Sequence, residues 1–146
     1  MEICDLLSAE SVISSIRVTS KKQLLQEVSL CAANICGKNE RTIFDILIER
    51  ERLGTTGIGR GVAIPHGKLP ELDHLYGVFV KLEQPIDFES MDDEAVDLIF
   101  LLLAPETAGA DHLKALAQIS RMFRDAVICK KLRSAKDKVA LCKLLL

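Results

Sequence analysis

The segment from Val96 to Ala104 limits the possible folds more than any other part of the chain. Apart from Asp97, every residue in it is apolar. Because successive side chains of a strand point to opposite faces, apolar residues at both odd and even positions predict a strand buried on both sides. The run is far shorter than the roughly 20 residues that a membrane-spanning helix needs. The sequence therefore predicts a central strand in a sheet that is covered on both faces.

Two helices are expected before this strand. The first covers 21–36, with Ser20 as N-cap, Gln23 as its capping-box partner and Gly37 as the stop. The second covers 40–53. The residues expected on its buried face are Ile43, Ile46, Leu47 and Leu53.

Three helices are expected after it, over 110–124, over a short stretch to 132, and from a Ser134 cap with Asp137 at the third helical position to the C-terminus. The residues expected on one face of the first are Leu113, Leu116, Ala117, Ser120 and Phe123. Further strands are expected over 13–18, 62–64 and 75–82, the last followed by a loop with Pro85. Alternating strands and helices indicate an α/β layered sandwich.

Composition excludes several classes of protein. The chain has 146 residues, which favours one domain over 1–146, and it is too apolar (49%) and too nearly neutral (net charge −2) to be disordered. With no Trp, 4% aromatic residues and no excess of cations, a nucleic-acid partner is not expected. The N-terminus shows no secretory signal and five cysteines indicate reduced thiols, so we expect a cytoplasmic protein without membrane insertion.

The stretch over 54–67 has the most unusual composition, with five glycines, the last of them in Pro65-His66-Gly67. Pro65 fixes the backbone before His66, and Gly67 leaves the space after it open, so the imidazole is expected at a strand end within reach of another molecule. A turn histidine that caps a loop is the simpler alternative. His112, at the start of a helix, is expected to stay neutral, with a capping or surface role as its alternative. His74 is expected to be solvated.

Other motifs do not fit known sites. The stretch from Gly61 to Lys68 has the wrong glycine spacing for a phosphate-binding P-loop, and 57–61 lacks the dinucleotide-binding pattern. The histidines lack metal-ligand spacing, which disfavours a metal-dependent hydrolase. The cationic run at Lys130, Lys131 and Arg133 is read as a solvated helix end.

A histidine beside a glycine-rich loop suits phosphoryl transfer. Neutral imidazole is a nucleophile near pH 7, and the group it carries can be passed on. Donors around the phosphoryl oxygens are expected from Arg50, from hydroxyls and from backbone N–H groups. The residues expected around the phosphate are Thr55, Thr56, Gly57, Gly59 and Gly67. No metal or cofactor is needed if the donor is itself a phosphohistidine.

The motif at 50–67 resembles a known family. The order Arg-Glu-x-x-Gly-x-Thr-Gly-Ile-Gly over 50–59, followed by Val-Ala-Ile-Pro-His-Gly over 62–67, is similar to the active-site signature of the fructose/mannitol-type enzyme IIA of the phosphoenolpyruvate-dependent phosphotransferase system. It is most similar to the nitrogen-regulatory branch. The resemblance implies a mixed, mostly parallel sheet flanked by helices on both faces. It also implies that His66 accepts phosphate from an HPr-like histidine phosphocarrier, with His112 as second active-site histidine and Arg50 lining the site.

Three functions remain open at this point. The first is a phosphoryl carrier, dependent on upstream carriers and not an autonomous kinase, whose phosphorylation state is read by regulatory target proteins. The second is a sugar-specific IIA that donates phosphate to a separate IIB subunit of a fructose- or mannitol-type permease. The third, of another class, is a regulatory binding module in which His66 is never phosphorylated.

Overall fold

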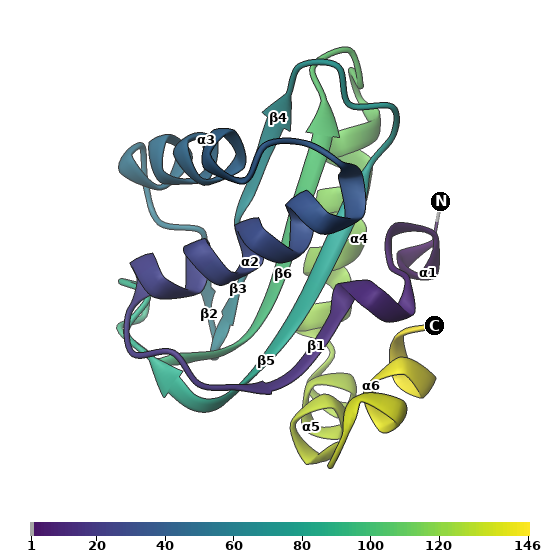
Figure 1. The fold of residues 1–146 in the computed structure, drawn as a ribbon. Coiled ribbons are helices and arrows are strands. Elements are labelled where there is room, and N and C mark those ends of the chain that lie inside the picture. Colours follow the sequence, from purple (N-terminus) through teal and green to yellow (C-terminus); the bar gives the residue numbers. More distant parts are fainter. Residues whose placement is uncertain (1) are drawn as a thin grey trace.

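The computed structural model describes residues 2–146 (Figure 1). The helices, in chain order, are α1 Ile3–Leu6, a 3-10 turn Ala9–Ser11, α2 Lys21–Cys36, α3 Glu40–Arg52, α4 Asp111–Arg124, α5 Ala126–Ser134 and α6 Lys138–Leu145. The strands are β1 Val12–Ile16, β2 Gly57–Gly59, β3 Val62–Ala63, β4 His66–Leu69, β5 Tyr76–Ile86 and β6 Val96–Pro105.

The sheet is built around β6. Its order is β1-β5-β6-β3-β2, and β4 pairs with β6 on the same side as β3. The β1–β5, β3–β6 and β4–β6 pairs are parallel, whereas β5–β6 and β2–β3 are antiparallel. The mixed, mostly parallel sheet is therefore confirmed.

Helices cover both faces of this sheet (Figure 1). The side chains of Ile99, Leu101 and Leu103 belong to the core under α2 and α3. Those of Leu98, Phe100 and Leu102 belong to the second core, under α4, α5 and α6. This alternation is the double burial predicted for β6, and it divides the apolar interior into two layers.

The two long N-terminal helices begin and end near the predicted residues. The Ser20 side chain accepts a hydrogen bond from Gln23 N at 3.1 Å, and Gly37 adopts a left-handed φ of 74° at the end of α2. The Gln23 side chain binds the backbone N–H of Thr19 rather than that of Ser20. On α3, Ile43 and Leu47 are buried as predicted, but Leu53 is 86% exposed because it follows the last helical turn.

Two strand predictions need correction. Pro85 lies within β5, not in a loop, since the β5–β6 register is irregular between Lys81 and Ile86 and no ladder donor is required of the proline there. His66 follows the short strand β3 as predicted, but it also begins a further strand, β4, which was not predicted and which adds to the free edge of β6 beside Leu102.

The buried face of α4 also differs from the prediction. Ala115, Ile119 and Phe123 point into the core, whereas Leu113 is 61% exposed and Ala117 is exposed as well. The predicted and the observed face are both largely apolar and both contain Phe123, so the spacing of apolar residues alone does not show which face is buried. With the observed face buried, the Phe123 ring packs edge-on against Phe100 of β6, at 6.5 Å between ring centroids.

The start of α6 was predicted too early. Ser134 is the last residue of α5, and the Asp137 side chain caps α6 by accepting from Ala140 N at 2.8 Å. The Lys81 ammonium donates to the carbonyl oxygens of Arg133 and Ala135, which satisfies the C-terminal end of α5 and ends that helix.

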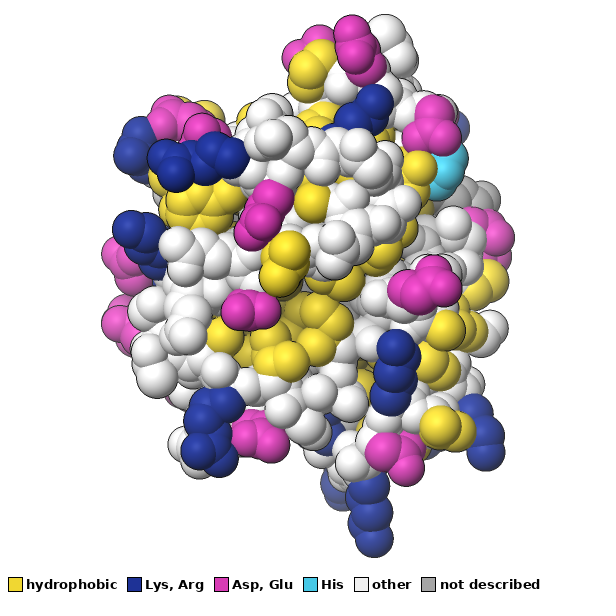
Figure 2. Space-filling model, viewed as in Figure 1, with side chains coloured by type: hydrophobic (Ala, Val, Ile, Leu, Met, Phe, Trp, Pro, Cys, Tyr) yellow, Lys and Arg dark blue, Asp and Glu magenta, His cyan; other side chains and the backbone are white. Residues whose placement is uncertain are grey.

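Charges of both signs are interspersed on the face seen in Figure 2. Hydrophobic side chains are visible between α2 and β1, where Ile13, Ile16, Leu30 and Ile35 line an open groove. None of the helices within residues 2–146 combines the length and the apolarity required to cross a membrane.

The capping assignment predicts unequal effects of two substitutions. Asp137→Ala is expected to lower the free energy of unfolding by about 1 kcal/mol, because it leaves a backbone N–H of α6 without its acceptor. Ser134→Ala, the matched control, is expected to change it by no more than about 0.5 kcal/mol. Urea unfolding followed by circular dichroism measures both, and a larger loss for Ser134→Ala would contradict the assignment.

Candidate functional site

His66 lies at the junction between β3 and β4 and is half-buried. Its backbone is held beside Leu102 of β6. The ring turns back along the chain, and Nδ1 lies 2.9 Å from the carbonyl oxygen of Ile64. The central strand thus fixes the backbone of His66, and Ile64 fixes the plane of its imidazole.

Arg50 in the last turn of α3 contacts the other ring nitrogen. Its Nε lies 3.3 Å from His66 Nε2, and its Nη1 donates to the carbonyl oxygen of Gly54 at 2.9 Å. A guanidinium can only donate, so Nε2 must accept and Nδ1 carries the proton that is donated to Ile64. The two contacts select one tautomer of a neutral ring, with its lone pair on Nε2.

Gly67 has a packing role that differs from the expected one. A Cβ atom at this position would lie 2.6 Å from Cγ2 of Ile46 on α3. The missing side chain therefore lets α3 approach β4 closely enough for Arg50 to reach His66.

The pKa of His66 lies below its ordinary value of 6.5. Burial of the ring is the largest cause, and the nearby charges of Arg50 and His112 lower it further. The hydrogen bond to Ile64 and the charge of Glu51 oppose the shift. The ring is accordingly neutral, and therefore nucleophilic, near pH 7.

His66 faces an open depression of about 410 Å³. The residues that line it are Ile46, Glu49, Arg50, Leu53, His66, Gly67, Lys68 and His112. His112 is the second residue of α4, and its Nδ1 lies 3.2 Å from the carbonyl oxygen of Gly109. The structure thus brings Arg50, Gly67 and His112 to His66, from three different elements.

The other residues predicted around a phosphate do not line this depression. The Thr55 hydroxyl binds the carbonyl oxygen of Phe88 and the N–H of Gly57. Thr56 is buried, and both its N–H and its hydroxyl bind the Glu51 carboxylate. Gly57 and Gly59 lie against Ser90 and Asp92, respectively. A phosphate contact from these four residues stays a prediction, and in this structure the two hydroxyls already have partners.

Two residues near the site, Lys68 and Glu51, were not predicted from the sequence. Lys68 lines the depression itself. Glu51 directly follows Arg50 in the chain. Its side chain is 6% exposed, and it holds Thr56 while pairing with Lys21 at 3.6 Å. Glu51 therefore fixes the loop that follows α3, and this loop lies next to Arg50. Its spacing offered a signal, because Ile43, Leu47 and Glu51 recur at four-residue intervals and so lie on one buried helix face.

His74 lies away from the depression. Its side chain is 62% exposed and its ring stacks on Tyr76. Within residues 2–146, no three His, Cys, Asp or Glu side chains come together as a metal-ligand set.

Comparison with known proteins places these features in a family. Residues 5–146 match the family described as phosphoenolpyruvate-dependent sugar phosphotransferase system, EIIA 2. The chain is 57% identical over 145 residues to the nitrogen regulatory protein of Bradyrhizobium diazoefficiens, covering 99% of this chain and 95% of that protein.

Solved structures agree in fold. The crystal structure of nitrogen regulatory protein IIA-Ntr from Neisseria meningitidis matches with a TM-score of 0.93 and 32% identity, covering 99% of both chains. The Escherichia coli complex of enzyme IIAMTL with phosphorylated enzyme IIBMTL matches with a TM-score of 0.79 and 18% identity, covering 95% of this chain and 96% of that one, a likeness of fold. The chain therefore belongs to the EIIA 2 family of the phosphoenolpyruvate-dependent sugar phosphotransferase system, in its nitrogen-regulatory branch.

Proposed function

We propose that His66 is the phosphoryl acceptor of a cytoplasmic phosphocarrier, with 1–146 as one phosphotransfer domain and with an HPr-like histidine phosphocarrier as its donor. The observation that carries the proposal is the pair of contacts on the imidazole: Nδ1 to Ile64 O at 2.9 Å and Nε2 to Arg50 Nε at 3.3 Å. Together they leave a neutral ring whose lone pair, on Nε2, faces the open depression beside Arg50.

The transfer step follows from this arrangement. Nε2 of His66 attacks the phosphorus of the donor phosphohistidine, so that the new N–P bond forms as the donor's N–P bond breaks. The Nδ1 proton stays in its hydrogen bond to Ile64, whose carbonyl dipole stabilises the positive charge that the ring acquires. No proton has to leave His66 during the step, and the donor's imidazole departs with its own electron pair.

Arg50 supplies the positive charge next to the transferred group. Its Nη1 is already held by Gly54, and within residues 2–146 its Nη2 has no hydrogen-bond partner. The Nη2 hydrogens are thus free to bind phosphoryl oxygens. Arg50 Nε moves from Nε2 to the same oxygens as the phosphoryl group approaches, because Nε2 attacks with the lone pair that accepts this hydrogen bond in the free protein. His112 and Lys68, on the rim of the same depression, add donors for the phosphoryl group.

Phosphorylation adds a charge of about −1.5 to −2 to this depression. A regulatory target protein that binds the cationic rim of Arg50 and Lys68 is expected to be released by it, and one that presents cations is expected to be recruited. The nitrogen regulatory proteins among the relatives favour this regulatory role over donation to a separate IIB subunit.

Removal of the acceptor tests the proposal. After incubation with labelled phosphoenolpyruvate and the upstream carriers, wild type is expected to become labelled and His66→Ala is expected to take up no label. His74→Ala is the matched control, because it removes a histidine outside the depression. Label retained by His66→Ala would refute the assignment of the acceptor.

The readout of phosphorylation is tested with a regulatory target. If charge at position 66 matters, His66→Asp and His66→Ala should differ in their affinity for that target. Equal affinities, combined with no labelling of wild type, would favour the non-phosphorylated binding module.

Arg50 is expected to act on the rate and on the pKa of His66. Arg50→Gln should slow phosphoryl transfer about 100-fold, as expected for loss of one charged donor at the reacting group. It should also raise the pKa of His66, because a neighbouring cation is removed. Arg52→Gln is the control, since Arg52 pairs with Glu49 at the solvent side of the same helix end. An NMR titration of the His66 ring and single-turnover labelling measure the two effects, and an unchanged pKa would contradict the assigned contact.

The lowered pKa of His66 also makes the free energy of unfolding depend on pH. The unfolded chain protonates this ring near pH 6.5, whereas the folded chain does so only at lower pH. Between these values the unfolded state binds more protons, so the free energy of unfolding falls as the pH falls. His66→Ala is expected to lose less stability than wild type between about pH 7 and pH 5. Urea unfolding at several pH values measures this, and parallel losses in both proteins would contradict it.

A further inference from the structure

A second pocket, of about 290 Å³, lies where the β2–β3 turn meets the C-terminal end of α4 and one face of α5. Four cationic side chains line it: Arg60 from the turn, Arg124 from α4, and Lys130 and Arg133 from α5. Figure 1 shows α5 at the end of the sheet away from β4. The pocket shares no lining residue with the His66 depression.

This concentration of positive charge does not follow from composition, because the chain as a whole carries a net charge of −2. Three carboxylates lie close to the residues of the pocket, and all three are engaged. Asp92 accepts from the N–H groups of Arg60 and Glu94. Asp97 binds Arg133 at 3.0 Å, and Asp125 caps α5 by accepting from the N–H groups of Val127 and Ile128. Within residues 2–146, no ion pair involves the side chain of Arg60, Arg124 or Lys130.

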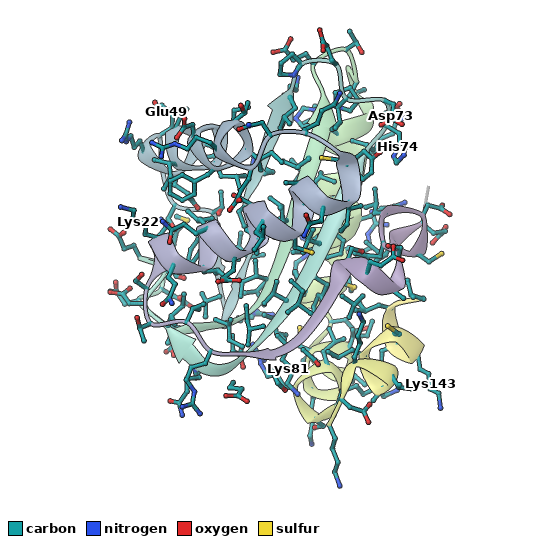
Figure 3. The ribbon with its side chains drawn as sticks, viewed as in Figure 1. Lys22, Glu49, Asp73, His74, Lys81 and Lys143 are labelled. Carbon is teal, nitrogen blue, oxygen red and sulfur yellow. The ribbon has the colours of Figure 1, made fainter. Side chains whose placement is uncertain are left out.

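Arg133 is fixed in place before any ligand arrives. Its Nε and Nη2 bind the Asp97 carboxylate, and Nη2 also donates to the carbonyl oxygen of Arg60 at 2.8 Å. Lys81, labelled in Figure 3, reaches from β5 to the end of α5 and binds the carbonyl oxygen of Arg133 at 2.7 Å. The Arg133 side chain is therefore in place before binding, which lowers the entropic cost of ordering this part of the pocket.

Arg60 occupies an unfavourable backbone conformation. Its φ is 59°, in the left-handed region where glycine or asparagine is the usual residue. Its N–H binds Asp92 at 2.9 Å and its carbonyl oxygen binds Arg133, so the turn is held at both ends. The Arg60 side chain therefore extends from a turn whose backbone is fixed on both sides.

The pocket also has an apolar floor, made by Phe123, Ala126 and Cys129. Its volume equals that of about ten waters at roughly 30 Å³ each, which is more than a single phosphate ion fills. Arginine and lysine side chains from three elements line this one pocket, and side chains of these types bind the oxygens of phosphate groups. We propose that this pocket binds a small phosphorylated molecule, with its phosphate held by Arg60, Arg124 and Lys130 and its remaining atoms on the apolar floor.

Binding is tested on the full-length, ¹⁵N-labelled chain by NMR titration with pyrophosphate, glycerol 3-phosphate and orthophosphate at constant ionic strength. The amides of 60–61 and 126–134 are expected to shift, those of 66–68 to stay unchanged, and the two larger probes to bind more tightly than orthophosphate. We expect a Kd of about 1 mM or tighter for the best probe, even though none of the three is assumed to be the natural ligand.

Matched substitutions separate this site from general surface charge. Lys130→Gln and Arg124→Gln are each expected to weaken binding about tenfold, as for loss of one charged hydrogen-bond donor. Lys131→Gln and Arg121→Gln remove equal charge from the same two helices outside the pocket, and are expected to weaken binding less than about twofold. Arg133 is left intact because it holds Asp97 and Arg60.

The outcomes that would overturn the proposal are distinct from those that bear on His66. Shifts confined to the His66 depression, equal losses in the four variants, or no saturable shift with any probe would each do so. Equal affinity for orthophosphate and the larger probes would contradict the size argument. Labelling of His66 by the upstream carriers does not depend on any of these results.

Discussion

Burial of β6 on both faces is the constraint on which the rest of the structure depends. Its odd and even side chains enter two separate cores, so α2 and α3 must cover one face and α4 to α6 the other. Its two edges are paired with β5 and with β3 and β4, which leaves no freedom in the register of His66. The same strand carries Leu102 beside His66 and Asp97 beneath Arg133. One apolar segment thus positions both the imidazole and the cationic pocket.

Local sequence signals predicted the elements whose stability is local. The Ser20 and Gly37 ends of α2, and the apolar run of β6, depend on hydrogen bonds within a few residues or on the residue types alone. The errors arose where a distant partner decides the structure. β4 forms because β6 offers a free edge, and α5 ends where Lys81, some fifty residues earlier in the chain, binds its last carbonyls. Neither partner is visible in the neighbouring sequence.

At the candidate site, too, some features were predictable from the local sequence and others depend on distant contacts. The motif over 50–67, together with His112, identified the three side chains that meet at the depression. It did not reveal that Thr56 is committed to the buried Glu51 carboxylate, since a hydroxyl in a glycine-rich loop is equally suited to bind phosphate. Gly67 was predicted to leave the space beside His66 open, whereas the close approach of Ile46 better explains why this position has no side chain. Residue type predicts what a group can do, and only tertiary contacts decide which of its possible partners it meets.

The distance between the cationic pocket and His66 limits how strongly a ligand at one site can influence the other. Asp97 and Leu102 are five residues apart on β6, so the cationic pocket and His66 are separated by about 16 Å along the strand. The Debye length at physiological salt is about 8 Å, so the charge of a ligand at Arg60 is largely screened at His66. The backbone of 61–66 also joins the two places, since β3 and the Ile64 carbonyl lie between the Arg60 turn and the His66 ring. Val62 and Ala63 in this stretch are buried and paired with Leu98 and Ile99 of β6, so the Ile64–Nδ1 hydrogen bond is held independently of the Arg60 turn. The two sites are therefore expected to act independently, in agreement with the unchanged amides expected at 66–68 when the cationic pocket is filled.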